Sequence, residues 1–296
     1  MPELPEVETV VRGLRAVLPG KRILNVRLGK TDFIDDPGAL ELQLPGSKVV
    51  AVRRHGKFIL VELESANGRK QESSLLIHLG MTGQIVTCPP EVPVLPHTHV
   101  FLGLDNGREL RYTDIRRFGR MAMLANTAHA SVLGKLGLDP LEATKNEFTE
   151  MIRSRRAHIK ALLLDQSVLR GMGNIYTDES LWRARIHPRR LGANLSDPEI
   201  HRLYAVVRRV LNEAIRLGGS SISDYVDAEG RPGEFQIRHR AYGREGKKCS
   251  RCGKKIRRII VAGRSSYLCP FCQRAPRAVR RRRMPACLPE SATFKS

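Results

Sequence analysis

The chain has 296 residues, of which 41% are hydrophobic, so it is long enough for one large domain or two ordinary ones and too apolar to be wholly disordered. It contains no run of about 18 apolar residues, the length that a membrane-spanning helix requires. The first ten residues, MPELPEVETV, carry acids where a signal peptide carries basic residues. We therefore expect a soluble, intracellular protein with no membrane partner.

The net charge of +21, from 51 Lys and Arg against 30 Asp and Glu, indicates a polyanionic partner. The tail after Cys272 holds seven basic residues and one acid, so the rest of the chain is itself basic. Nucleic acid is the simplest partner. Binding to an acidic membrane surface is the weaker interpretation, because no strongly basic amphipathic helix with aromatic anchors is visible.

The first third of the chain is predicted to combine one helix with β-strands. Apolar residues at helical spacing from Val7 to Leu18 predict a helix that Pro19 and Gly20 end. The sequence DNG at 105–107 predicts a hairpin turn. Six segments rich in Val, Ile, Leu and Phe predict the strands of a β-sandwich: 22–28, 48–54, 57–64, 74–87, 99–104 and 109–124.

The middle of the chain is predicted to be helical. Thr144 with Glu147, and Ser196 with Glu199, form capping-box patterns ahead of apolar residues at helical spacing. Between them, RGMGNIYTDESLW contains a glycine turn that leads into another helix. Residues 219–246 are rich in Gly, Ser and charge and are predicted to form a long mobile loop.

Two Cys-x2-Cys pairs give the strongest chemical signal. Cys249 and Cys252 are separated by sixteen residues from Cys269 and Cys272, a spacing typical of a zinc ribbon or hairpin finger. Four thiolates fill a tetrahedral shell, so we expect one structural Zn²⁺ with no open position for a catalytic water. Two disulfides are the alternative, which an intracellular chain disfavours. Five cations between the pairs suit either phosphate binding or a solvated face: Lys254, Lys255, Arg257, Arg258 and Arg264.

The N-terminal residues offer a nucleophile. Removal of Met1 exposes Pro2 as a secondary amine, and a free α-amino group has a pKa of about 8. A useful fraction is therefore neutral at pH 7 and can attack an aldehyde-like sugar carbon to form a Schiff base. Glu3 and Glu6 offer a general acid. The alternative is that the prolines restrict the chain and the acids complement a helix dipole.

Several motifs in order along the chain resemble those of formamidopyrimidine-DNA glycosylases, bacterial repair enzymes for oxidised purines. They are MPELPEVET at 1–9, HLGMTG at 78–83, YTDIRRFG at 112–119, GMGNIY at 171–176, GGSS at 218–221 and AGRSSYLCPFCQ at 262–273. The related endonuclease VIII type usually differs just after the terminal proline, where this chain keeps ELPEVE.

The resemblance implies an α+β fold of consecutive domains. A β-sandwich with an N-terminal helix is expected over residues 1–135, and a helix–two-turns–helix domain over 136–246, whose loop at 219–246 covers the flipped base. A zinc-finger β-hairpin is expected over 247–273. The basic tail at 274–296 lies outside the pattern and is predicted to be disordered.

The resemblance also implies a bifunctional glycosylase and abasic-site lyase. Pro2 would attack C1′ of the damaged nucleotide, and Glu3 would act as an acid on the sugar. Lys57, in RRHGKF, would be the proton donor associated with β-elimination, and Arg264, in AGRSSY, the donor for δ-elimination. The product would be a one-nucleotide gap with phosphate at both ends.

The same resemblance implies contacts with damaged double-stranded DNA. Phosphate or groove contacts are expected from four side chains: His97, Arg116, Arg155 and Asn174. Arg156 is the alternative to its neighbour Arg155. Met81 and Phe118, with Arg116, resemble the wedge that fills the space left by a flipped base. The alternatives are that Met81 and Phe118 belong to the core and that Asn174 caps a helix.

Zinc is the one cofactor expected, with no small-molecule cofactor, and the resemblance implies a monomer in the cytoplasm, associated with the bacterial nucleoid. Two other functions remain open. One is an endonuclease VIII-type glycosylase for oxidised pyrimidines. The other is a noncatalytic DNA-binding zinc-finger protein of the same fold, against which the intact Pro2, Glu3 and Lys57 argue.

Overall fold

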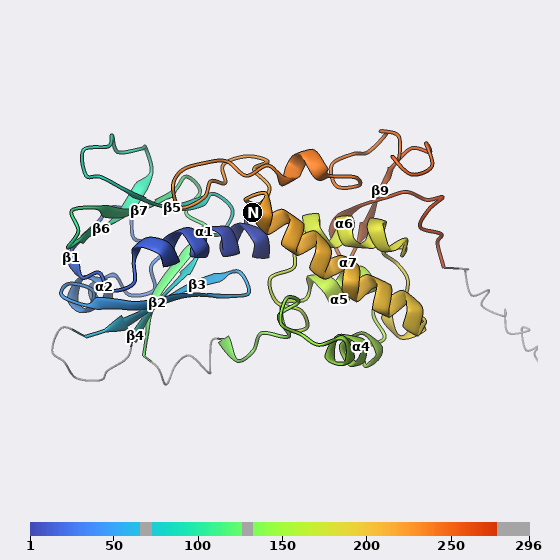
Figure 1. The fold of residues 1–296 in the computed structure, drawn as a ribbon, viewed down its shortest axis with the longest axis horizontal. Helices are drawn as coiled ribbons and strands as arrows, with labels where there is room; N and C mark the ends of the chain where they lie inside the picture. Colours follow the sequence, from blue (N-terminus) through green and yellow to red (C-terminus); the bar gives the residue numbers. More distant parts are fainter. Residues whose placement is uncertain (66–72, 126–132, 277–296) are drawn as a thin grey trace, which may run out of the picture.

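The computed structural model describes residues 1–65, 73–125 and 133–276. The predicted disordered tail falls outside the described residues from residue 277 onward. Within the described residues the chain is α+β, as expected, with a β-rich N-terminal part, a helical part and a C-terminal hairpin (Figure 1).

Two antiparallel four-stranded sheets form the N-terminal part, which confirms the predicted sandwich. One sheet has the order β1-β6-β7-β5 and consists of β1 (Ile23–Leu28), β5 (Gly83–Cys88), β6 (Thr98–Leu104) and β7 (Glu109–Asp114). The other has the order β2-β3-β4-β8 and consists of β2 (Lys48–His55), β3 (Phe58–Glu64), β4 (Ser73–His78) and β8 (Arg120–Ala125). The predicted turn at 105–107 joins β6 to β7.

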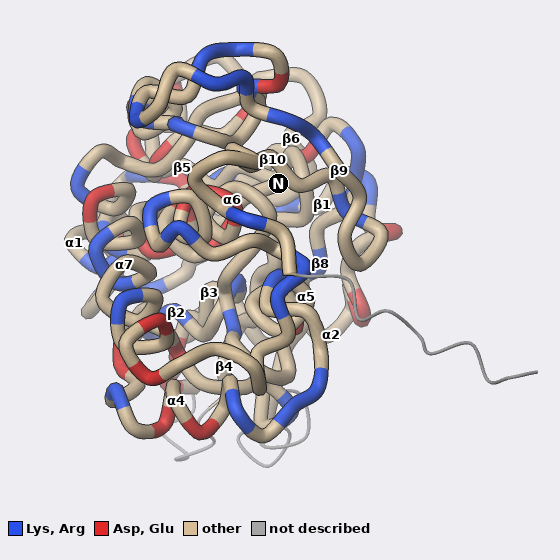
Figure 2. The backbone as a smooth tube through the Cα atoms, turned by 90° about the vertical axis from the view of Figure 1, so that its right-hand side faces the viewer, with Lys and Arg blue, Asp and Glu red and all other residues tan. Residues whose placement is uncertain are grey.

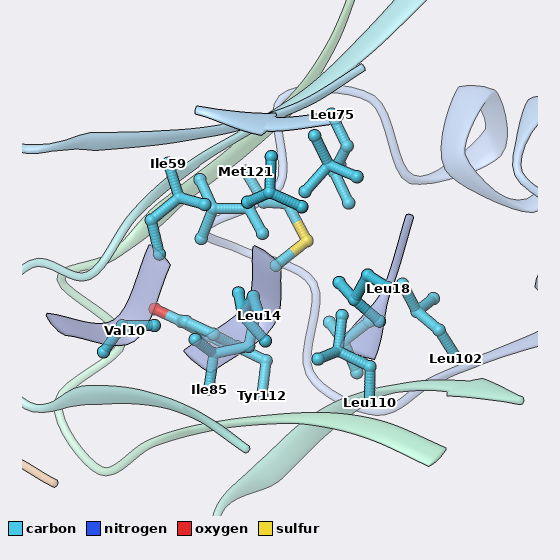
Figure 3. Close-up of a cluster of buried hydrophobic side chains, with 14 of the residues drawn as sticks. Val10, Leu14, Leu18, Ile59, Leu75, Ile85, Leu102, Leu110, Tyr112 and Met121 are labelled. Carbon is cyan, nitrogen blue, oxygen red and sulfur yellow. The ribbon is translucent and has the colours of Figure 1, made fainter. Parts of the chain in front are cut away.

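Helix α1 (Leu4–Val17) lies between the two sheets (Figure 3). Its apolar stripe, with Val10 and Leu14, continues to Leu18 just after the helix, and these side chains face both sheets. Their neighbours come from both sheets: Ile59, Leu75 and Met121 from one, and Ile85, Leu102 and Leu110 from the other. The helix ends before Pro19 and Gly20, as the sequence predicts.

Two segments predicted as continuous β-structure are each divided between the sheets. Segment 74–87 becomes β4 and β5, and segment 109–124 becomes β7 and β8, because the HLGMTG and IRRFG sequences cross from one sheet to the other. The crossings touch: a Cβ on Gly80, whose φ is +59°, would lie 2.4 Å from the carbonyl carbon of Phe118. Only glycine satisfies both constraints at that position.

A short helix, α2 (Pro37–Gln43), was not predicted. The sequence does contain its start signal, because Asp36 accepts a hydrogen bond from the amide of Ala39 and Pro37 occupies the first helical turn.

Among the described residues, four helices build the second core: α4 (Lys145–Arg153), α5 (Ile159–Leu164), α6 (Asn174–Ala184) and α7 (Asp197–Arg216). The capping boxes predicted at Thr144 and Ser196 are both present. Short 3-10 helices occur at η1 (Gly192–Asn194) and η2 (Phe235–Arg238). The segment 219–246, predicted to be a long mobile loop, is anchored to this core, since Phe235 is fully buried in it.

The C-terminal hairpin consists of β9 (Arg257–Val261) and β10 (Arg264–Leu268). It packs on α6 through a small buried cluster: Trp182, Ala241, Cys249, Ile256 and Cys269. Among the described residues, no helix combines the length and the apolar character needed to cross a membrane.

Replacing Leu14 by Ala is expected to lower the free energy of unfolding by about 2–5 kcal/mol, because it leaves a cavity between the sheets where the residue is fully buried. Leu42→Ala is the matched control, since that leucine is 82% exposed and its loss should cost less than about 0.5 kcal/mol. Denaturant unfolding monitored by circular dichroism measures both. Equal losses would show that α1 is not a core element.

Candidate active site and DNA-binding surface

The first residues of the chain are held at the N-terminus of α6. Glu3 is 2% exposed, and its carboxylate accepts hydrogen bonds from the amides of Ile175 (2.9 Å) and Tyr176 (3.3 Å). Amides in the first turn of a helix have no intrahelical partner and favour an anion. A Cβ on Gly173 would lie 2.3 Å from Cδ of Glu3, so the GMGNIY motif is what makes this approach possible. Pro2, next to Glu3, is buried.

Glu6 ties these residues to the start of the 219–246 segment. It accepts hydrogen bonds from the amide of Glu3 (2.8 Å), the amide of Ser220 (2.7 Å) and the hydroxyl of Tyr176. Burial, reinforced by the negative charge of Glu3, raises the pKa of Glu6 to about 7. Burial also raises the pKa of Glu3, although the charge of Lys57 and the two α6 amides oppose that rise.

Lys57 brings a cation from the sandwich to the same place. It stands at the turn between β2 and β3 and is 9% exposed. Burial lowers its pKa, while the charges of Glu3 and Glu6 act in the opposite direction. The charge of Arg264 also lowers the pKa of Lys57. The hairpin that carries Arg264 is attached to α6, because the amide of Tyr267 on β10 donates a hydrogen bond to Asp178 (2.9 Å). The structure therefore brings Pro2, Glu3, Lys57 and Arg264 together from three parts of the chain.

The side chains expected to contact DNA are accessible. His97, Arg116 and Arg155 are exposed, as is Arg156, and Asn174 is partly buried. Asn174 is the first residue of α6, whose N-cap is Gly173, so the helix-cap alternative is wrong.

The core alternative for Met81 and Phe118 is also wrong, because these side chains are 39% and 56% exposed. The Arg116 guanidinium lies 4.6 Å from the centroid of the Phe118 ring. Cation and ring are therefore arranged together on the β7–β8 crossing, beside the β4–β5 crossing that carries Met81.

The cysteines form one cluster. The sulfur atoms of Cys249, Cys252, Cys269 and Cys272 all lie within 4.8 Å of one another, and none forms a disulfide. This spacing fits one tetrahedral zinc ion, whose bonds to sulfur are about 2.3 Å long. The disulfide alternative is wrong. Because every ligand position is a thiolate, the metal centre is structural.

Positive charge surrounds the site. Figure 2 shows Lys and Arg segments along β9 and beside α5, with the N-terminus between them. Exposed arginines on the hairpin include Arg257, Arg258 and Arg264. This distribution suits a polyanion such as the DNA backbone.

Sequence reasoning missed three buried charged residues around α6. Lys160 and Asp178 form an ion pair of 2.6 Å. Oε1 of Glu179 accepts hydrogen bonds from the amides of Arg240, Ala241 and Tyr242 at 2.8, 2.8 and 3.0 Å, which anchors the end of the 219–246 segment. A detectable signal existed, because a lysine within IKALLL and consecutive acids in NIYTDESLW interrupt otherwise apolar helices.

Comparison with known protein families gives consistent matches along the chain. Residues 1–121 match the N-terminal domain of formamidopyrimidine-DNA glycosylase, and residues 136–226 match its H2TH domain. Residues 246–275 match the zinc finger found in FPG and IleRS.

Curated relatives include the formamidopyrimidine-DNA glycosylases of Pelotomaculum thermopropionicum and Heliobacterium modesticaldum. The first is 43% identical over 280 residues, covering 93% of this chain and 99% of the relative. The second is 44% identical over 284 residues, covering 93% and 100%.

Among solved structures, a mutant Lactococcus lactis enzyme bound to Fapy-dG-containing DNA has a TM-score of 0.84 at 34% identity, covering 93% of this chain and all of that one. MutM bound to DNA with carbocyclic 8-oxo-G gives 0.83 at 34% identity, with coverage of 93% and 100%. The wild-type Lactococcus lactis enzyme with DNA containing an oxidised pyrimidine gives 0.83 at 33% identity, with the same coverage. This chain belongs to the formamidopyrimidine-DNA glycosylase family.

Proposed function

We propose that this DNA glycosylase of base-excision repair removes oxidised purines, namely 8-oxoguanine and formamidopyrimidines, and then cleaves the abasic site by β,δ-elimination. The observation that carries the proposal is the position of Glu3, which the α6 N-terminal amides hold beside Pro2, while Asp178 of the same helix binds the strand β10 that begins with Arg264. The charge of Glu3 also acts on the buried Lys57. We expect the enzyme to meet its DNA substrate in the bacterial cytoplasm. One copy of the chain contains every residue that this mechanism uses, so we expect it to act as a monomer.

Pro2 acts as the nucleophile once Met1 has been removed. Its nitrogen lone pair forms a bond to C1′ of the damaged nucleotide, and the base departs with the bonding electrons of the glycosidic bond. The nitrogen then loses its proton, which neutralises the departing base, and its lone pair forms the iminium as the C1′–O4′ bond opens and Glu3 delivers a proton to O4′. The buried position of Glu3 supports this role, since burial raises its pKa and favours the protonated acid.

Two eliminations follow from the iminium. In the first, the C2′ proton is lost to water and the 3′-phosphate leaves with the electrons of the C3′–O3′ bond, with Lys57 as the associated proton donor. In the second, the C4′ proton is lost to water and the 5′-phosphate leaves with the electrons of the C5′–O5′ bond, with Arg264 in the corresponding role. Each step releases a phosphate-terminated strand. The different surroundings of the two side chains support their different roles. Lys57 is buried near Glu3 and Glu6, whereas Arg264 is exposed on the hairpin.

The base must leave the stack before Pro2 reaches C1′, at a cost of about a few kcal/mol. Met81, Arg116 and Phe118 occupy the vacated space and offset that cost. His97, Arg155 and Asn174 bind the backbone, and the segment 219–246 covers the extruded base. The exposure of Met81 and Phe118 supports this assignment, because a wedge must project from the surface.

Oxidised pyrimidines are the second candidate substrate class, since a related enzyme was solved with DNA containing one. Duplexes carrying 8-oxoguanine and an oxidised pyrimidine, mixed in one reaction with distinct labels, separate the two. We expect the purine lesion to be removed first, with the larger kcat/KM. Preferential removal of the pyrimidine lesion would reverse the assignment.

An additional residue ahead of Pro2 is expected to reduce strand cleavage at least about a hundredfold, because an amide nitrogen cannot form an iminium. Binding to lesion duplex should persist. The same tag placed at the C-terminus is the control and should leave cleavage intact. Gel assays of cleavage and binding measure both, and full turnover by the N-terminally tagged protein would remove Pro2 as the nucleophile.

Removal of zinc is expected to weaken DNA binding and cleavage together. Binding of a structural zinc supplies on the order of 10 kcal/mol of folding energy, and without it the hairpin that carries Arg264 loses its geometry. Cys252→Ala tests this with metal analysis and binding titrations. Cys88→Ala is the control, since Cys88 lies in β5 outside the cluster. Unchanged activity in a verified metal-free protein would contradict the structural assignment.

Stability should fall with rising pH because of Glu6. The unfolded chain releases this proton near pH 4.5, whereas the folded protein keeps it until about pH 7. Between these pH values the folded state binds more protons than the unfolded chain. Raising the pH therefore lowers the free energy of unfolding by about 1 kcal/mol per pH unit. Glu6→Gln removes this contribution. The difference between the unfolding free energies at pH 5 and 7 should therefore be smaller in the variant, and an identical pH slope in both proteins would contradict the assignment.

A further inference from the structure

The hairpin is attached to the helical domain through a buried ion pair that the proposed chemistry does not use. The side chains of Lys160 on α5 and Asp178 on α6 are 0% and 1% exposed, with Nζ 2.6 Å from Oδ1. Burying two charges carries a large desolvation cost, and apolar residues of similar volume often stabilise a fold equally well. General stability is therefore a weak explanation for this pair.

Both members of the pair also bind the backbone of β10. Nζ of Lys160 donates a hydrogen bond to the carbonyl oxygen of Ser265 (2.8 Å), and the amide of Tyr267 donates one to Oδ2 of Asp178 (2.9 Å). Within the described residues, β10 pairs with β9 on one side, and no strand lies along its other edge. The ion pair occupies that edge as a further strand would.

These contacts fix the strand next to Arg264. Arg264 immediately precedes Ser265 and follows a tight turn in which Ala262 and Gly263 both have left-handed φ angles, of 49° and 69°. Holding the carbonyl of Ser265 and the amide of Tyr267 sets the direction in which the strand leaves this turn. The arginine's backbone is therefore held from both sides.

The same helix, α6, also holds Glu3, the proposed catalytic acid, through its N-terminal amides. Asp178 lies three residues after Ile175 and two after Tyr176, whose amides bind Glu3. The charges of both Glu3 and Arg264 affect the pKa of Lys160. One rigid helix thus connects the acid at the sugar with the strand that carries the arginine.

We propose that the Lys160–Asp178 pair is a positioning device that fixes Arg264 relative to Glu3 and thereby sets how completely δ-elimination follows β-elimination. Neither residue contacts the reacting atoms in this scheme. The inference rests on the proposed function, because it takes Arg264 as the donor in the second elimination.

Lys160→Met tests the proposal, since it keeps the length of the side chain and removes its charge. On abasic-site duplex, we expect the ratio of δ- to β-elimination product to fall about tenfold, the scale of effect caused by small misplacement of a reacting group. Borohydride trapping of the covalent intermediate should change less than about twofold, because Pro2 and Glu3 are untouched. Lys160→Arg retains a cation and should restore most of the ratio.

Leu102→Ala is the matched control. Loss of this buried side chain of β6 should lower stability, and the residue lies in the sandwich, away from the hairpin. Asp178→Asn is the second variant if Lys160→Met does not fold. An unchanged product ratio in a folded, zinc-loaded variant overturns the proposal. So does an equal fall in Leu102→Ala, since general destabilisation then explains it.

Hydrogen exchange without DNA gives a readout that is independent of chemistry. The amide of Tyr267 should exchange at least about tenfold faster in Lys160→Met than in the parent chain. In Leu102→Ala its exchange rate should match that of the parent chain. Unaltered exchange in β10 overturns the proposal even if the parent chain shows no lyase activity. Failure of the parent chain to form a trapped adduct would instead refute the proposed function, so the two failures are distinguishable.

Discussion

The carboxylate of Glu3 on the N-terminal amides of α6 is the contact on which the rest of the site depends. It joins the first turn of α1, a helix of the sandwich, to the helical domain, and both amides point at a group that is 2% exposed. Burial of the acid is unfavourable, but helix-terminal amides without other partners offset much of that cost. Pro2 has little freedom as a result, because the residue after it is held on two hydrogen bonds.

Helix α6 then organises elements that are far apart in the sequence. Beyond its N-terminus it holds β10 through Asp178, the end of the 219–246 segment through Glu179, and the cysteine cluster through packing of Trp182. A second attachment joins the sandwich to the segment that precedes α4. There the guanidinium of Arg54 binds both Glu8 and Asp139 at 2.8 Å. The groups proposed to act in catalysis therefore depend on contacts between several parts of the described chain, and a zinc ion held by the cysteine cluster would order the hairpin.

The sequence predicted the parts of this structure that have local signals. The apolar stripe of α1, the capping boxes at Thr144 and Ser196, and the cysteine spacing each depend on residues close together in the chain, and all were confirmed. The division of 74–87 and 109–124 between two sheets was not predicted, because an apolar run carries no information on which sheet it joins. Its physical cause is the close approach of two crossings at Gly80.

Contacts between distant residues were also beyond local patterns. The motifs indicated that Pro2, Glu3, Lys57 and Arg264 belong to one site, but not that the amides of α6 hold the acid. Lys160 and Asp178 are eighteen residues apart, and each alone reads as an ordinary charged residue on a helix. Only the fold shows that both side chains are buried and that both bind the backbone of β10.

A crystal structure of the borohydride-reduced covalent complex with lesion DNA would show which amine carries the sugar. We expect a single bond from the nitrogen of Pro2 to C1′ of the deoxyribose, with the Glu3 side chain next to the opened sugar and within hydrogen-bonding distance of the Ile175 amide. A bond from the sugar to Nζ of Lys57, or a Glu3 carboxylate displaced from α6, would contradict it.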